Sequence, residues 1–266
     1  MGRPRGGGCH RVRGASRPEE ANPGGRFPEP PAGLTVSAAV SRRTVLRATA
    51  TLFGVACLPR AGAAGATLVE DWATHQVGAR GVPTGWREYE TPAGRPRYDF
   101  TIVDDGGRRA LDLKSEGDHS TIAKEVQVEL AQTPVLEWAW KVMRVPAHAD
   151  LRNKATSDAT GHVFVVWPRW PALLRSRLIG YVWDRALPTG SVVKSRKTGT
   201  VTFIVVASGE QGLREWRVQR RNVVEDYRKV FDETPTDPGA VALSIDTNDT
   251  RSEAETLFGR IAFAAR

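Results

Sequence analysis

The chain has 266 residues, a formal net charge of +8 and 40% hydrophobic residues, which is enough apolar material for one sizeable core. Ten Arg and three Glu precede residue 67, so 28 basic and 27 acidic residues remain after it. Both cysteines, Cys9 and Cys57, also precede residue 67. For residues 67–266, composition therefore gives no support to a general nucleic-acid binder. It excludes disulfides, cysteine-ligated zinc, iron–sulfur clusters and attached haem.

The first recognisable segment is Ser41–Arg47, whose sequence Ser-Arg-Arg-Thr-Val-Leu-Arg is typical of a twin-arginine export signal. The uncharged, largely apolar run 48–59 follows, and the small residues at 61–66 would allow a signal peptidase to cut after Ala63 or Ala66. This run is too short to span a bilayer, which needs roughly 20 apolar residues. A lipoprotein anchor at Cys57 is the alternative. We therefore expect export to the periplasm or the extracellular medium.

Residues 1–40 are rich in Gly, Pro and Arg and have almost no aliphatic periodicity, so they are expected to be disordered or to reflect a misassigned translation start. A start at Val36 or Val40 would place the arginine pair close to the terminus, as export signals require. We expect three parts: residues 1–40, a signal peptide at 41–66, and a single domain at 67–266.

Short segments that alternate apolar and polar residues, separated by turn residues, run through this domain and predict strands. The predicted strands are 68–72, 86–90, 98–103, 110–115, 122–130, 135–143, 162–167, 179–183, 200–207, 215–221, 241–246 and 260–264. Two rows are expected to face the core: Ile122, Val126, Val128 and Leu130 in one, and Leu136, Trp138, Trp140 and Val142 in the other. This pattern predicts an all-β fold, an antiparallel β-sandwich.

One helix is expected after Asn222, which can cap it together with Glu225. Four apolar residues then share one face before Pro235 ends the helix: Val223, Tyr227, Val230 and Phe231. A second, shorter helical turn is expected at 173–178. All eight Trp lie between residues 72 and 216. They are either large core residues or platforms on which sugar rings stack.

The run Asp246–Thr250, Asp-Thr-Asn-Asp-Thr, is the densest polar cluster and directly follows an apolar strand. Oxygens of Asp246, Asn248 and Asp249 could hold a structural calcium ion, although the glycine and final acidic residue of an EF-hand loop are absent. The alternative is an Asx-type turn that closes the strand. No other cofactor is expected.

Two further segments combine aromatic and basic residues. In 216–221, alternation places Trp216 and Arg220 on one face, where an arginine beside an indole suits a carboxylate, phosphate or sugar, or forms a buried ion pair with Asp226. Segment 167–197 contains seven basic residues and one acidic residue, interleaved with Trp and Leu. Such a segment suits an anionic glycan or membrane surface, or is a solvated loop whose aromatic residues reach the core.

Several of these motifs resemble a family of exported bacterial proteins, domain of unknown function 3047. They are Leu136–Val142, Ala149–Lys154, Ser157-Asp158, Tyr181–Trp183, Arg220–Tyr227 and Asp246–Thr250, and the likeness extends over residues 68–263. The Asp-Thr-Asp-Asn-Thr of that family is altered here to Asp-Thr-Asn-Asp-Thr. The pattern around Pro83–Trp86 is similar to jelly-roll, galactose-binding-like domains that bind carbohydrate. The resemblance therefore implies a fold, and fold alone does not give function.

Three functional hypotheses follow. The first is an exported protein that binds a saccharide or another cell-envelope component, with no chemistry of its own and no nucleic-acid partner. Its candidate contacts are Trp183, Trp216, Arg220, Asp226, Asp158 and Asp246. The second is a glycan-active enzyme using paired carboxylates drawn from Asp150, Asp158 and Asp226. The third is a peripheral protein that contacts anionic membrane through segment 167–197.

Overall fold

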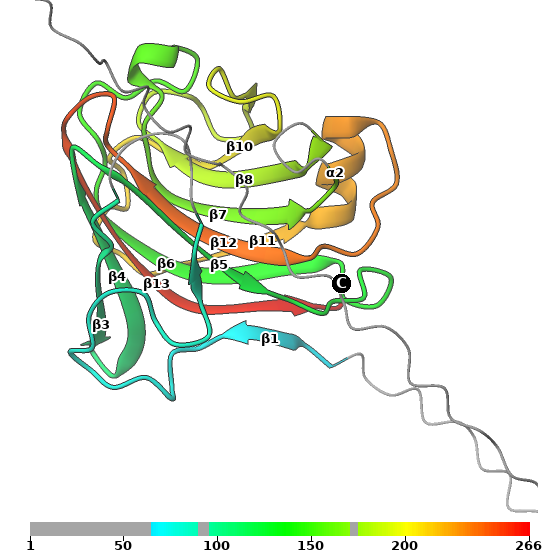
Figure 1. Ribbon diagram of the computed structural model, residues 1–266, viewed down its shortest axis with the longest axis horizontal. Helices are drawn as coiled ribbons and strands as arrows, with labels where there is room; N and C mark the ends of the chain where they lie inside the picture. The colour runs from blue at the N-terminus through cyan, green and yellow to red at the C-terminus, as the bar shows by residue number, and fades with distance from the viewer. Residues whose placement is uncertain (1–64, 90–95, 171–174) are drawn as a thin grey trace, which may run out of the picture. The chain divides into compact units, whose positions relative to one another are not determined.

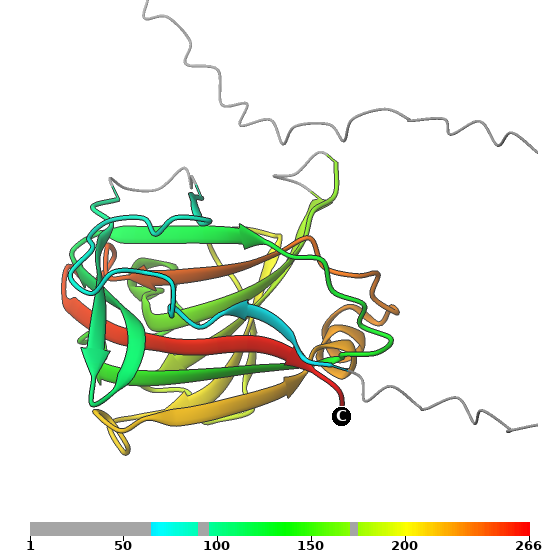
Figure 2. The same ribbon diagram turned by 90° about the horizontal axis from the view of Figure 1, so that it is seen from below.

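Two β-sheets pack face to face in the part of the chain that the computed structural model describes, which is residues 65–89, 96–170 and 175–266. The predicted export signal at Ser41–Arg47 lies outside these residues, as do Leu173 and Leu174 of the predicted helical turn. Figure 1 shows the strands of both sheets running across the molecule, and Figure 2 shows the two layers one above the other. The predicted all-β sandwich is confirmed.

The first sheet is antiparallel throughout, and β13 lies at its centre. Its spatial order is β11 (Arg217–Asn222), β6 (Val135–Arg144), β13 (Glu253–Ala264), β4 (Arg108–Glu116) and β3 (Asp99–Asp105). The first half of β13 pairs with β4, and its last residues pair with β1 (Thr67–Glu70). The strand predicted at 260–264 is therefore only the end of a longer one.

The second sheet has seven strands. Their spatial order is β2 (Arg87–Glu88), β5 (His119–Glu125), β12 (Ala240–Asp246), β7 (Ala159–Trp167), β8 (Arg177–Asp184), β10 (Val201–Ser208) and β9 (Val192–Lys194). Every residue of β7 and β12 is buried, as expected of central strands that are covered on both faces. β7 ends directly before Pro168, which lacks the N–H needed to continue the ladder.

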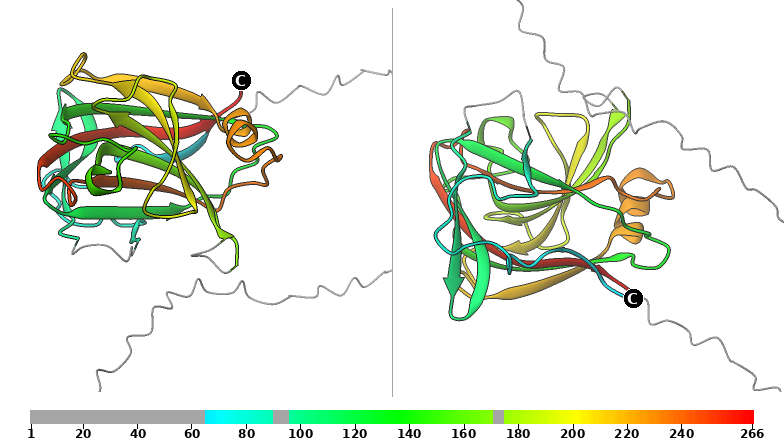
Figure 3. Two further views of the ribbon diagram at one scale, coloured as in Figure 1. Left: turned by 90° about the horizontal axis from the view of Figure 1, so that it is seen from above. Right: turned by 60° about the horizontal axis from the view of Figure 1, so that its bottom comes forward.

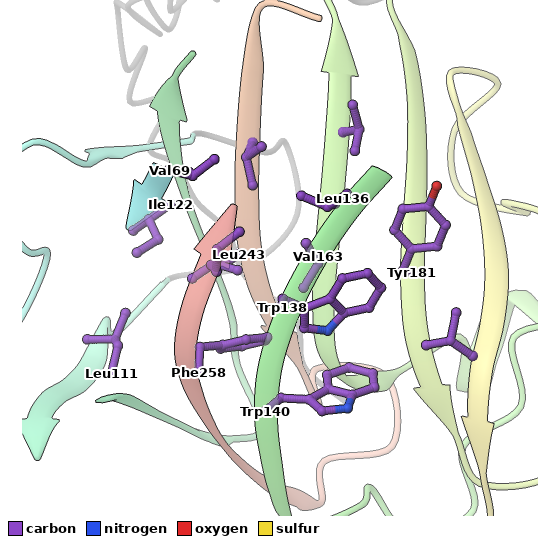
Figure 4. Close-up of a cluster of buried hydrophobic side chains, with 14 of the residues drawn as sticks. Val69, Leu111, Ile122, Leu136, Trp138, Trp140, Val163, Tyr181, Leu243 and Phe258 are labelled. Atoms are coloured by element: carbon purple, nitrogen blue, oxygen red, sulfur yellow. The ribbon is translucent and has the colours of Figure 1, made fainter. Parts of the chain in front are cut away.

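The core between the sheets contains the row predicted on β6. Leu136, Trp138, Trp140 and Val142 are completely buried. Figure 4 shows Trp138 and Trp140 reaching from β6 toward Tyr181 on the facing sheet. The rings of Trp138 and Tyr181 stack with centroids 5.3 Å apart, a contact worth about 1 kcal/mol beyond the area it buries. Six of the eight Trp are buried: Trp72, Trp86, Trp138, Trp140, Trp167 and Trp183.

The seven-stranded sheet also carries a second apolar layer on its outer face, including Phe164 on β7 and Phe203 on β10. Both rings crowd over Gly180 of β8, where an added Cβ would lie 2.6 Å from Phe164. Leu151 and Leu187, from two connections between strands, belong to the same layer. These contacts explain why strands of this sheet are buried on both faces.

The predicted helix is α2 (Val223–Phe231), which lies at one end of the sandwich (Figure 1). The side-chain oxygen of Asn222 accepts a hydrogen bond from the Glu225 amide at 3.2 Å, as the predicted cap requires. Val223 and Tyr227 are buried against the core. Asp232 caps the end of the helix with a left-handed φ of 54°, and Pro235 follows three residues later. Among the described residues, no helix is long and apolar enough to cross a membrane.

Two details of the strand prediction are wrong. β8 and β10 pair in parallel, because the chain leaves β8, forms the edge strand β9 and then returns between the two as β10. The strand predicted at 122–130 ends at Glu125, because the chain then leaves the ladder and the Leu130 amide donates to Asp237. Val128 and Leu130 are nevertheless buried in the core, from a loop instead of a strand.

Candidate functional site

The two predicted aromatic contacts are both engaged within the protein. Trp183 is only 1% exposed, and its indole N–H donates to the Gly209 carbonyl at 2.8 Å. Trp216 is half-buried: its N–H donates to Asp105 at 2.6 Å, and the Arg108 guanidinium lies over its ring at 4.7 Å. Trp183 is therefore a core residue, and Trp216 carries an arginine where a sugar ring would stack.

The neighbouring arginines form ion pairs. Arg220 pairs with Glu137 at 2.6 Å, whereas Arg221 forms a two-pronged contact with Asp226, including an Nε–Oδ2 distance of 2.9 Å. The Tyr181 hydroxyl also donates to the Asp226 carboxylate at 2.9 Å. Burial, reinforced by the Asp226 charge, raises the pKa of Tyr181 well above its usual value. The ion pair weighed from the sequence thus exists, but it uses Arg221 instead of Arg220.

The cluster predicted from Asp246, Asn248 and Asp249 is assembled around a lysine that the sequence did not point to. The Lys197 ammonium lies 3.4 Å from Asp246, 3.3 Å from Asn248 and 2.5 Å from Asp249. Lys197 arrives from the turn between β9 and β10, about 50 residues earlier in the chain. Although burial opposes its charge, these carboxylates raise the pKa of Lys197. Calcium binding at this cluster stays a prediction. The Lys197 ammonium contacts all three residues predicted to bind the ion.

Asp158 completes this cluster from the segment before β7. One carboxylate oxygen accepts the Asp249 amide at 3.1 Å, and the other accepts the Thr250 amide at 2.7 Å and its hydroxyl at 2.6 Å. Asp158 also lies close enough to Asp246 to affect its titration. Burial, with the Asp158 charge in addition, raises the pKa of Asp246 to about 7 despite the nearby Lys197. The cluster therefore joins three segments: the turn after β12, the β9–β10 turn and the segment before β7.

A row of polar side chains continues from this cluster across the outer face of the seven-stranded sheet. His162 is buried, stacks on Phe164 at 5.3 Å and lies 3.3 Å from the Ser244 carbonyl. Burial lowers the pKa of His162 to about 3, so its ring is neutral at physiological pH. His119 contacts the hydroxyls of Thr121 and Ser244. Both histidines therefore take part in hydrogen bonds within the protein.

The three acids considered for paired-carboxylate chemistry each have separate partners. Asp150 accepts two hydrogen bonds from the Arg152 guanidinium, at 2.9 and 2.8 Å. Asp226 is held by Arg221, and Asp158 by backbone amides. Within the cluster, Asp158 adds to the effect of burial in raising the pKa of Asp246. This pair of carboxyls was not among the pairs considered from the sequence.

Segment 167–197 divides into a buried and an exposed part. Trp167 is a core residue whose indole N–H donates to the Thr236 carbonyl at 2.8 Å. Trp170, only three residues later and beyond Pro168, is 84% exposed. Between the described ends of this β7–β8 connection, the Arg169 amide donates to the Ser176 hydroxyl at 3.2 Å. Trp170 therefore lies on the surface, next to the point where Arg169 and Ser176 are hydrogen-bonded.

A basic pocket of about 420 Å³ lies beside this hydrogen bond. It is lined by Arg169, Arg175, Ser176, Arg177, Lys194, Gly199, Thr200, Thr202, Val230 and Phe231. We call it the basic pocket. Arg177 donates to Glu233 at 2.7 and 2.6 Å and to the Tyr227 hydroxyl at 2.8 Å, and its guanidinium lies 4.6 Å from the Phe231 ring centre. The hydrogen bonds to Glu233 raise the pKa of Arg177 above its usual value.

A second pocket of about 590 Å³ lies along the edge strand β9. It is lined by Arg152, Leu187, Ser191, Val192, Val193, Lys194, Ser195 and Arg196, and we call it the edge pocket. Lys194 lines both pockets. In the left view of Figure 3, the yellow strands of this edge lie nearest the viewer.

A third pocket, of about 510 Å³, lies beside the connection between β1 and β2, and Glu70 is one of its lining residues. This buried carboxylate accepts hydrogen bonds from the Trp72 amide, the Trp86 indole and the Lys124 ammonium. Although burial opposes ionisation, these donors hold the pKa of Glu70 below its usual value. No sequence pattern indicated this arrangement. It fastens the Pro83–Trp86 turn to the sandwich.

The architecture and these surface pockets define the chain as a β-sandwich with polar pockets at its surface. A family model described as "Protein of unknown function (DUF3047)" matches residues 84–262. The chain belongs to this family, which confirms the resemblance found in its motifs. A search of the curated proteins finds no match.

Solved structures similar to the chain include carbohydrate-binding modules. The family 11 module of the cellulosomal cellulase Lic26A-Cel5E of Clostridium thermocellum is 7% identical with a TM-score of 0.41, covering 76% of this chain and 95% of the module. The family 30 module of Cel9D-Cel44B from the same organism is 10% identical with a TM-score of 0.40, covering 71% and 95%. The xyloglucanase domain of NopAA from Sinorhizobium fredii is 9% identical with a TM-score of 0.38, covering 73% and 100%. At such identities the resemblance concerns the fold alone.

Proposed function

We propose that the protein binds a saccharide at the basic pocket, with Trp170 as a stacking platform. The observation that supports this proposal most directly is the 84% exposure of Trp170, which follows the pocket-lining residue Arg169 in the chain. An indole combines a large apolar face with a polar N–H, which suits a sugar ring that has both kinds of surface. An indole this exposed is not part of the core, so its face is accessible to a ligand.

The lining of the basic pocket supports the same assignment. Its volume of about 420 Å³ falls within the range of pockets that take small ligands. Guanidinium groups and the hydroxyls of Ser176, Thr200 and Thr202 can bond sugar hydroxyls, while Val230 and Phe231 supply an apolar wall. By contrast, the contacts inferred from sequence at Trp183 and Asp226 are buried and already paired within the protein.

We also propose that binding takes place outside the cytoplasm, in the periplasm or the extracellular medium. The support for this is the twin-arginine segment Ser41–Arg47. Envelope and extracellular polysaccharides are available there, so the proposed location and the proposed ligand class agree.

Isothermal titration of the purified protein against neutral and acidic oligosaccharides tests the binding proposal. We expect at least one oligosaccharide to bind, and Trp170→Ala to weaken that binding about tenfold through loss of the stacking contact. The matched control is Val218→Ala, which removes another exposed apolar side chain, on β11 of the other sheet. No binding across the panel, or equal losses in both variants, would contradict the proposal.

A further inference from the structure

We infer that the saccharide is acidic and that it crosses the edge strand β9, with negatively charged groups in both the basic pocket and the edge pocket. This inference rests on the proposed function and names the ligand class of the same site. Its starting point is the geometry of β9, a strand of only three residues at the end of the sheet. Lys194, its last residue, lines both pockets and so joins them into one surface.

The charge of this surface is unbalanced. The basic pocket is lined by four cationic side chains and the edge pocket by three, with Lys194 common to both. The carboxylates in contact with these groups are Glu233, which pairs with Arg177 and Arg169, and Asp150, which pairs with Arg152. Arg175, Lys194 and Arg196 are exposed and form no ion pair with any carboxylate in the described parts of the chain.

This local excess stands out because residues 67–266 as a whole are nearly neutral, with 28 basic and 27 acidic residues. The two pockets therefore concentrate three exposed cations without ion-pair partners in a domain whose positive and negative charges are otherwise nearly equal in number. One exposed ion pair contributes little to binding, but several like charges around concave pockets raise the local concentration of an anionic ligand. An arginine fork pairs with a carboxylate, sulfate or phosphate group through two parallel hydrogen bonds.

The hydroxyl groups distinguish a glycan from a lipid surface. Ser176, Thr200 and Thr202 line the basic pocket, and Ser191 and Ser195 line the edge pocket, so both pockets combine cationic groups with hydroxyl groups. A sugar acid presents charge and hydroxyls together, in a ring small enough to enter a pocket. A membrane surface instead favours a continuous protruding apolar face beside the charges, and the site offers concave, hydroxyl-lined pockets.

The test compares charged and neutral forms of the same sugar chains by isothermal titration of the purified protein. The probes are oligogalacturonate and oligomannuronate, each beside its carboxyl-reduced neutral counterpart, and phosphatidylcholine vesicles containing phosphatidylglycerol. We expect at least one acidic oligosaccharide to bind at least tenfold more tightly than its neutral counterpart. Its affinity should fall as salt is raised from 20 to roughly 200 mM, because exposed charges are screened.

Variants locate the site. Arg175→Ala and the double variant Lys194→Ala/Arg196→Ala should each weaken acidic binding at low salt, about threefold for the single and about tenfold for the double change. Arg260→Ala is the matched control: it removes an exposed arginine from β13 of the other sheet and should leave the affinity unchanged. Equal binding of acidic and neutral chains would overturn the inference while leaving saccharide binding intact. Vesicle binding with no oligosaccharide binding would overturn both proposals in favour of a membrane role.

Discussion

The stability of the protein should depend on pH through Asp246, and replacing this residue with Asn should remove that dependence. In the folded protein burial raises the pKa of Asp246 from 3.8 to about 7. The folded state therefore keeps this proton up to about pH 7, whereas the unfolded chain releases it near pH 4. Because the folded state binds more protons in this window, the free energy of unfolding falls as pH rises from about 4 to 7.

The size of the effect follows from about 1.4 kcal/mol per pH unit for one fully bound proton. Because the folded carboxyl is already half-titrated at pH 7, the change between pH 5 and pH 7 is about 2 kcal/mol. Asp246→Asn has no such proton. Its free energy of unfolding relative to wild type should therefore rise by about this amount over the same interval. Any constant loss from weakening the contact with Lys197 would cancel in that comparison, since Lys197 stays charged throughout.

Urea denaturation at pH 5, 6 and 7, on wild type and Asp246→Asn, measures this difference. The control is Asp232→Asn, which changes an exposed carboxylate at a left-handed position that Asn tolerates well. The control should keep a constant offset from wild type. A constant offset for Asp246→Asn as well would refute the reasoning, because Asp246 would then titrate alike in both states.

Three further predictions concern the core, the buried imidazole and export. Trp138→Ala should lower the free energy of unfolding by about 3 to 5 kcal/mol, whereas Trp170→Ala should change it by less than about 0.5 kcal/mol; urea denaturation of both would show whether the two indoles differ as their burial requires. Because the pKa of His162 is lowered to about 3 in the folded protein, only the unfolded chain takes up this proton between pH 6.5 and 4, and the free energy of unfolding should fall over that range. The free energy of unfolding of His162→Phe should therefore rise relative to wild type from pH 6.5 to 4. A difference between the two proteins that does not change with pH would contradict this. Replacing Arg42 and Arg43 together with Lys should retain the protein in the cytoplasm of a bacterium with a twin-arginine translocase, as cell fractionation would show, and undiminished export would remove the assigned signal.

The elements that could be predicted from sequence are those encoded by neighbouring residues. Strand β6 places large apolar residues at every second position from Leu136 to Val142, so Trp138 and Trp140 could be placed on the core face. The α2 cap is likewise local, because Asn222 and Glu225 are three residues apart. The position of β10 between β8 and β9 could not be predicted, since it depends on which strand edges meet after the chain has crossed the sheet.

The candidate site shows the same limit. Trp183 lies in β8, where nearly every residue is apolar and buried, so alternation could not tell an inward from an outward indole. Pro168 between Trp167 and Trp170 was the local signal that a core strand ends and an exposed loop begins. The contact of Lys197 with Asp246 and Asp249 had no such signal, because it joins two turns that only folding brings together.

The most direct test of saccharide binding follows the eight indole N–H resonances in a ¹H–¹⁵N spectrum while an oligosaccharide that binds in calorimetry is added. The exposed Trp170 indole, assigned with Trp170→Phe, should shift progressively to saturation. The buried indoles of Trp138, Trp140 and Trp183 should remain in place. Saturation with no shift of Trp170, or with shifts confined to other indoles, would contradict a saccharide site at the basic pocket.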